Sequence, residues 1–348
     1  MYLYFAGAEA HCPRLYENGV RRMLASFYYI WRKRKGKGFK YMENMFSKYG
    51  KSIRWFMDSG AFTLQQERKD VDNVDCDSFL DDYIYSLKQW KNYIECAVEL
   101  DLDNFMGMGW VLYARQRIIN ETGITPLLVH HLDTRSFPEF KKNCKQYPYI
   151  GFSIGDGDLF YTNKFLPYYF TARQTKTKLH AFGITQPFIL MKYHFYSCDS
   201  FSWSMGAKFG TTFENVRGQM NRHNNYEKHI RRKFISQLQR WGIPVQDVLN
   251  DKYIPVDRFN TIQWILCEQD INKRHPKPYW NEPREGMNTV PDKIGLRSKL
   301  YDSNDRLINP LPINHRGKRV VNLKKLFSRS DIRRKGLRKK KELKDEEA

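Results

Sequence analysis

The chain has 348 residues, of which 41% are hydrophobic and 15% aromatic, so it can bury a sizeable core and is not an intrinsically disordered protein. Its formal net charge of +21 predicts a polyanionic partner, nucleic acid first and an anionic membrane surface second. No run of about 20 apolar residues is present, which excludes a transmembrane helix. The N-terminus also lacks the basic start and long apolar segment of a signal peptide.

The six cysteines are widely spaced, without a CxxC or CxC pair, at Cys12, Cys76, Cys96, Cys144, Cys198 and Cys267. A disulfide scaffold is not expected at this length, and the usual ligand spacing of a structural zinc site is missing. We therefore expect reduced thiols in an intracellular, cytoplasmic protein.

The N-terminal part predicts a strand, a helix and a second strand. Residues 2–6 are apolar and end before Gly7, which indicates a first strand. Apolar residues at helical spacing from Val20 to Trp31 predict a helix over about 16–33. It runs into 32–40, a loop with six cations and no acid that is suited to phosphate contact. The second strand reads Trp55-Phe-Met-Asp58 and stops at a carboxylate, followed by Ser59 and Gly60.

Further strands alternate with helices as far as residue 215. Helices are predicted over 77–94 and 110–122, with a short one before Tyr149, and strands over 96–103, 125–130, 149–155, 178–184, 195–200 and near 208–213. This alternation favours an α/β fold, a (β/α)8 TIM-like barrel spanning 1–215. The alternative is an open doubly wound sheet, but no GxGxxG fingerprint follows the first strand.

The composition changes after residue 215. Tyr226, Ile230, Phe234, Leu238 and Trp241 are spaced as on a helix, and a second helix is expected around Phe259 to Leu266, which together predict a helical extension over 216–275. Residues 276–348 form an irregular extension and a basic tail. In 316–341, 13 Lys and Arg face the single Asp331, so this segment carries +12 of the total charge and suits a mobile, anion-binding tail.

Carboxylates follow several of the predicted strands. In a barrel the carboxyl ends of the strands share one mouth, so we expect Asp58, Asp101 or Asp103, and Asp199 to converge there, lined by Gly60, Gly151, Gly155 and Gly183. Paired acids suit chemistry at a glycosidic carbon, where one attacks the anomeric centre and the other protonates the leaving group. Mg²⁺ binding and simple helix capping are the competing explanations. Of the tandem pair His130-His131, one side chain can face the mouth.

The motifs and their order resemble the tRNA-guanine transglycosylase superfamily over roughly 1–215, above all its DNA-guanine transglycosylase branch (DpdA) with its short phage-encoded members. Met57-Asp-Ser-Gly-Ala-Phe62 is similar to the family's DSGGFQ motif, and Tyr149-Ile-Gly-Phe-Ser-Ile-Gly-Asp156 to its GGLxVGE segment. His180-Ala-Phe-Gly-Ile-Thr185 resembles (L/M)GxGTP. Ser197-Cys-Asp-Ser200 falls where the nucleophilic Asp lies.

The resemblance implies a barrel that exchanges guanine in DNA for a 7-deazaguanine base such as preQ0 or a derivative, without a redox cofactor or metal. It implies Asp199 as nucleophile and Asp58 as acid/base group. The implied substrate-binding residues are Ser59, Gly60, Asp101, Asp103, Gly151, Gly155, Phe182 and Gly183; which of the two acids in Glu99-Leu-Asp-Leu-Asp103 reads the base stays open. Phosphate contacts are expected from Arg32, Lys33, Arg34, Lys35, Arg333, Arg334 and Lys335.

The chain also departs from the family's pattern. The CxCxxC and His that hold zinc in the tRNA enzymes are missing, PTR is replaced by Phe201-Ser-Trp203, and GGFQ ends here in Thr63. These departures weigh against tRNA as substrate more than against the barrel. The alternatives are the same exchange on tRNA, a non-catalytic nucleic-acid-binding barrel, and a metal-dependent nuclease.

Overall fold

The computed structural model describes residues 1–33, 36–68, 75–132, 134–153, 160, 163–275, 278–280, 287–290, 300–301 and 307–308. The chain divides into two compact units, Met1–Ser298 and Lys299–Ala348. In the second unit, β11 (Leu300–Tyr301) and β12 (Leu307–Ile308) form an antiparallel pair. The remaining description concerns the first unit.

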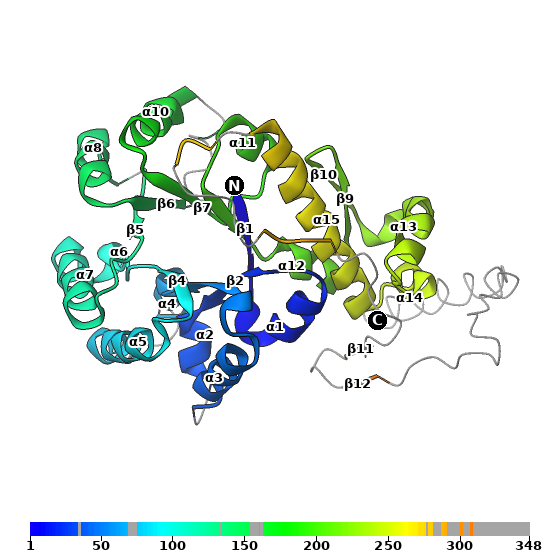
Figure 1. Cartoon of the computed structure of the whole chain (residues 1–348), viewed down its shortest axis with the longest axis horizontal. Coiled ribbons are helices and arrows are strands. Elements are labelled where there is room, and N and C mark those ends of the chain that lie inside the picture. Colours follow the sequence, from blue (N-terminus) through cyan, green and yellow to red (C-terminus); the bar gives the residue numbers. More distant parts are fainter. Residues whose placement is uncertain are drawn as a thin grey trace, which may run out of the picture. The chain divides into compact units, whose positions relative to one another are not determined.

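The first unit is built on an eight-stranded parallel sheet (Figure 1). Its strands are β1 (Tyr2–Ala6), β2 (Arg22–Ser26), β3 (Arg54–Asp58), β4 (Ile94–Ala97), β5 (Leu128–Val129), β6 (Tyr149–Ser153), β7 (Lys178–Phe182) and β8 (Ser197–Ser200). Their order in the sheet is β4-β3-β2-β1-β8-β7-β6-β5. A parallel bridge between Val98 and Leu127 joins the ends of β4 and β5, the two edge strands. The sheet is thus curled, as in a TIM-like barrel.

Helices connect the successive strands, as expected for parallel neighbours that need crossover connections. They are α1 (Ala8–Glu17), α2 (Phe27–Arg32), α3 (Lys37–Tyr49) with η2 (Gly50–Ser52), α4 (Ala61–Arg68), α5 (Cys76–Trp90), α6 (Asp103–Met106), α7 (Met108–Thr122), α8 (Phe137–Gln146), η4 (Asn163–Phe165) with α10 (Leu166–Thr175), α11 (Pro187–Lys192) and α12 (Ser202–Lys208). None of the described helices combines the length and apolar character needed to span a membrane.

The predicted helix over 16–33 is wrong, because β2 lies inside it. All five residues of β2 are buried, so the strand shows no alternation of polar and apolar residues, and its spacing also fits a helix. The strand predicted as the second, at residues 55–58, is therefore β3, and each later predicted strand is likewise one place further along in the strand order. The predicted basic loop 32–40 is also partly helical, since α3 begins at Lys37.

The strand predicted near 208–213 does not belong to the parallel sheet. Instead β9 (Thr212–Val216) pairs with β10 (Gln219–His223) in an antiparallel hairpin. The segment from Tyr226 to Trp241 was predicted as one helix. It contains two short 3-10 helices, η5 (Asn225–Glu227) and η6 (Ile230–Phe234), followed by the α-helix α13 (Ile235–Arg240). Two further helices follow, α14 (Val245–Leu249) and α15 (Tyr253–Arg274).

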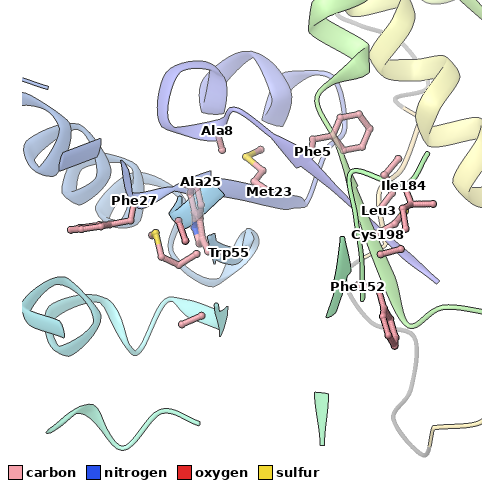
Figure 2. Close-up of a cluster of buried hydrophobic side chains, with 14 of the residues drawn as sticks. Leu3, Phe5, Ala8, Met23, Ala25, Phe27, Trp55, Phe152, Ile184 and Cys198 are labelled. Atoms are coloured by element: carbon pink, nitrogen blue, oxygen red, sulfur yellow. The ribbon is translucent and has the colours of Figure 1, made fainter. Parts of the chain in front are cut away.

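Side chains of each strand alternate between two cores, as expected for a curled sheet. The outer core lies between sheet and helices and includes Leu3, Phe5 and Trp55 (Figure 2). Intervening residues such as Tyr4 and Phe56 form a second cluster inside the sheet. The same alternation points Asp58 of β3 and Asp199 of β8 to the inner side.

The helix α15 lies against the start of β1. The backbone N–H of Leu3 donates a hydrogen bond to Glu268 Oε1 (2.8 Å), and the side chain of Asn272 donates to the carbonyl of Met1 (2.8 Å). Ile265 and Ile271 of this helix belong to the same buried cluster as Leu3. These contacts place this part of α15 at the start of β1, opposite to the strand ends that carry the carboxylates.

Candidate active site

Two carboxylates, Asp101 and Asp199, act on a third, Asp58, at the carboxyl ends of the strands. Burial, followed by the negative charges of Asp101 and Asp199, raises the pKa of Asp58 from 3.8 to about 7. The backbone N–H of Gly60 and the Ser26 side chain oppose this rise. The structure thus brings together Asp58 from β3, Asp101 after β4 and Asp199 from β8, and it gives Asp58 a pKa at which a carboxyl can both release and accept a proton near neutrality.

Asp199 is held in place from two sides. Its Oδ1 accepts a hydrogen bond from the backbone N–H of Gly183 (2.8 Å), and His180 Nε2 lies 3.4 Å from the same oxygen. Gly183 has a φ of +64°, a conformation that glycine adopts at low cost. The Asp199 side chain keeps 14% of its surface exposed, so one carboxylate oxygen is anchored while the group stays accessible.

A buried polar chain leads from Asp199 into the inner core. His180 Nδ1 lies 2.5 Å from Ser197 Oγ, which in turn contacts the hydroxyl of Tyr149. Burial lowers the pKa of the His180 imidazole, while Asp199 opposes that change. The sequence reasoning did not select His180 as a site residue. Its alternation with Phe182, with the apolar Leu179 and Ala181 at the intervening positions, was the available signal that it points inward.

The two acids after β4 have different partners. Asp101 Oδ2 lies 3.1 Å from His131 Nε2, and the hydrogen bond between them is the main cause of a raised His131 pKa. Asp103 instead accepts a hydrogen bond from Arg135 (3.1 Å). Because Asp101 rather than Asp103 is among the charges that raise the Asp58 pKa, Asp101 is the acid beside the candidate centre.

Tandem histidines after β5 point to opposite sides, as the sequence predicts for a strand. His131 contacts Asp101 at the strand ends. His130 is fully buried between the sheet and its helices, with its ring 5.2 Å from that of Phe140 and 5.8 Å from that of Phe152.

The other expected binding residues have structural roles around this centre. Ser59 is buried, and its hydroxyl donates to the carbonyl of Glu99 (2.9 Å). A Cβ on Gly60 would lie 2.4 Å from Tyr28 Cβ, and one on Gly151 would lie 2.3 Å from Phe182 Cε2. Both glycines therefore permit close packing at the strand ends, and Phe182 covers Gly151.

Several expected contacts cannot be placed. Gly155, Arg34, Lys35, Arg333, Arg334 and Lys335 lie outside the described residues. Arg32 and Lys33 line a pocket of about 350 Å³ together with Glu9, Ala10 and Tyr29. All six cysteines are free thiols. Among the described residues, no cluster of three or more His, Cys, Asp or Glu is arranged to hold a metal ion.

The fold and the site define an α/β protein with a curled eight-stranded parallel sheet and three interacting carboxylates at its carboxyl end. Comparison of the chain with models of known protein families and with curated proteins found no match.

Proposed function

We propose that this chain is a DNA-guanine transglycosylase, which exchanges guanine in DNA for a 7-deazaguanine base. The observation that carries the proposal is the position of Asp58 and Asp199 on the inner side of the sheet at the carboxyl ends of β3 and β8, where burial and the charges of Asp101 and Asp199 raise the pKa of Asp58. Two neighbouring acids suit glycosidic chemistry, in which one donates a proton while the other attacks. The net charge of +21 is consistent with a nucleic-acid substrate.

In the proposed reaction a guanosine nucleotide is flipped out of the duplex into the site. A carboxylate oxygen of Asp199 bonds to C1′ of the sugar as the bond between C1′ and guanine breaks. The Asp58 carboxyl gives its proton to the departing guanine and becomes a carboxylate. The incoming 7-deazaguanine then loses a proton to Asp58 and attacks C1′, which releases Asp199 and restores the starting state.

The anchored oxygen of Asp199 supports its role as nucleophile. Gly183 N–H and His180 restrain Oδ1, which limits the rotation of a carboxylate whose side chain keeps 14% of its surface exposed. Asp101 lies beside Asp58 and can accept hydrogen bonds from the amide and amino groups of a guanine-like base. The neighbouring carboxylates that raise the Asp58 pKa also favour an enzyme over a non-catalytic nucleic-acid-binding barrel, because strongly perturbed pKa values cluster at functional sites.

The test is the substitution Asp199→Asn, which removes the nucleophile and keeps the size of the side chain. We expect no incorporation of labelled 7-deazaguanine into DNA and no covalent protein–DNA complex after denaturation, while DNA affinity stays within about 2-fold of the original, because phosphate contacts dominate binding. Asp81→Asn is the matched control, since the Asp81 side chain is 62% exposed in its pair with Arg117 and should retain exchange.

Exchange that survives in Asp199→Asn would overturn the assigned nucleophile. The same assay with tRNA in place of DNA separates the two substrates: incorporation into tRNA alone would replace the DNA proposal by its tRNA alternative. Loss of activity with EDTA would instead point to metal-dependent chemistry.

A further inference from the structure

A pocket opens beside the candidate active site, between the segments that follow β1 and β2. Its volume is about 350 Å³, at the lower end of the range for small-ligand sites. Glu9 and Ala10 come from the first turn of α1, and Tyr29, Arg32 and Lys33 from α2 and the residue after it. None of these five residues takes part in the exchange reaction proposed above.

One residue connects this pocket to Asp58. The backbone N–H of Ser26, at the end of β2, donates to Glu9 Oε2 (3.4 Å). The side chain of Ser26 lies beside Asp58 and helps to lower its pKa. A Cβ on Gly60 would also lie within 2.8 Å of Ser26 Oγ, so the turn after Asp58 packs directly on this residue. The pocket and the proposed acid/base group are therefore neighbours.

The pocket lining combines three kinds of chemistry. Tyr29 offers an aromatic surface that is 44% exposed. Arg32 is exposed, and the Lys33 Nζ is held by a hydrogen bond to the carbonyl of Glu9 (2.6 Å). Glu9 lines the same pocket and is only 7% exposed, so its carboxyl is recessed relative to the exposed Arg32.

A ring surface, two cations and a recessed hydrogen-bonding group match the three parts of a nucleotide. Aromatic side chains stack on bases of any type. Arg and Lys pair with phosphate. A carboxyl group can meet the N–H edge of a base. A lipid headgroup or an inorganic anion would use the cations but not Tyr29.

We propose that this pocket is a nucleotide subsite, which holds the nucleotide next to the one that is exchanged. Tyr29 stacks on its base, Arg32 and Lys33 face its phosphate, and Glu9 faces the edge of the base. The claim that this nucleotide is the neighbour of the exchanged one rests on the proposed function, which places the exchanged nucleotide at Asp58. The binding of an unpaired nucleotide by the pocket does not depend on catalysis.

The experiment is a double-mutant cycle that combines the substitution Tyr29→Ala in the protein with single abasic sites in the DNA. The probe is a fluorescein-labelled hairpin whose loop contains one guanosine, with variants that lack the base immediately 5′ or immediately 3′ of it. Affinity is measured by anisotropy without added free base. For the unsubstituted protein, loss of one of these two bases should weaken binding roughly 5- to 10-fold, the low end of the effect of one stacked base.

In Tyr29→Ala, removal of the same base should weaken DNA binding by less than about 2-fold, because the aromatic ring that stacks on this base is already absent. Tyr29→Phe keeps the ring and should behave like the original protein. Tyr85→Ala is the matched control: this tyrosine of α5 is 60% exposed and does not line the pocket, so the abasic effect should remain.

The assignment fails if neither abasic site weakens DNA binding by the original protein. It also fails if an abasic site weakens DNA binding by Tyr29→Ala as much as it weakens binding by the original protein. An excess of deoxyguanosine monophosphate distinguishes a free nucleotide from one within the strand. If it abolishes the abasic effect in the original protein, the pocket binds a free nucleotide and the proposed neighbour is wrong. Survival of exchange in Asp199→Asn would be a separate result, which would overturn the proposed nucleophile and leave this binding cycle interpretable.

Discussion

Asp58 illustrates how neighbouring residues determine the protonation of one group. An isolated Asp at the end of a strand would ionise near pH 4. Here burial and two further carboxylates disfavour the charged form, so the pKa of Asp58 rises to about 7. Ionisation of Asp58 therefore lowers the free energy of unfolding, so the candidate site affects the stability of the protein.

Asp58→Asn should stabilise the protein in a pH-dependent manner. The folded pKa of Asp58 exceeds its ordinary value of 3.8, so ionisation favours the unfolded state. This penalty is nearly absent at pH 4, grows between pH 4 and 7, and is complete above about pH 7. A shift of three units corresponds to at most about 4 kcal/mol, and partial exposure of Asp58 reduces our expectation to about 2 kcal/mol at pH 8.

Urea unfolding of Asp58→Asn at pH 4 and pH 8 measures this difference. Asp81→Asn is the control, because the Asp81 side chain is 62% exposed in its pair with Arg117. An equal gain at both pH values would contradict the assigned electrostatic origin.

His180 is expected to position Asp199. Removing the imidazole in His180→Ala leaves Oδ1 with the Gly183 N–H alone, so the carboxylate can rotate away from C1′. We expect kcat for base exchange to fall roughly 10- to 100-fold with little change in KM, because misplacement of a reacting group affects the chemical step. His180→Gln, which keeps a polar group, should lose less. A fall that follows only the loss of folded protein, measured by thermal unfolding, would indicate a structural role instead.

At the scale of one element, the turn from β3 into α4 places Asp58. Gly60 has a φ of +78°, and a Cβ there would lie 2.4 Å from Tyr28 Cβ. The turn can approach the end of β2 only because this residue has no side chain. The contact between the two connections also holds Ser26 against Asp58.

Gly60→Ala should destabilise the protein by about 2–4 kcal/mol, the sum of left-handed strain and overpacking. Gly123→Ala is a matched control, because Gly123 has a φ of +73° but open space around its Cβ position. It should cost only about 1–2 kcal/mol, for backbone strain alone. Denaturant midpoints give both values, and equal costs would show that the close approach of Tyr28 is not restrictive.

At the scale of the whole molecule, the joint between β4 and β5 is the weakest part of the curled sheet, since it consists of the Val98–Leu127 bridge. Glu99 reinforces it. Its buried carboxylate accepts hydrogen bonds from the Val129 N–H (2.7 Å) and from Arg115 Nε (2.6 Å), and so connects β4, β5 and α7.

Glu99→Ala should cost about 3–5 kcal/mol, because it leaves the Arg115 cation buried without its partner. Glu121→Ala is the surface control. Glu121 pairs with Lys88 and Arg117 at 33% side-chain exposure, and its loss should cost about 0–1 kcal/mol. Chemical unfolding compares the two; similar costs would show that the buried pair does not reinforce the joint.

Local patterns were sufficient for much of the fold and for the strand-end positions of several acids. Apolar runs, most of them ending near a carboxylate or glycine, predicted seven of the eight parallel strands and placed Asp58, Asp101 or Asp103, and Asp199 at strand ends. The strand β2 was missed because a strand buried on both faces has no alternating signal. The contacts of His180 were not predicted, because the residues beside it in the sequence do not indicate which distant residues it will meet in the folded protein.

The sequence by itself determined an alternating α/β chain, its large positive charge, and acids at the ends of its strands, because each of these depends on neighbouring residues along the chain. Only the tertiary structure decided which acids meet. Asp101 and Asp103 are two residues apart, yet Asp101 contacts His131 and acts on Asp58, whereas Asp103 pairs with Arg135. The raised pKa of Asp58 arises from its burial and from the charges of Asp101 and Asp199 at two other strand ends, and residues so distant in sequence become neighbours only when the sheet curls.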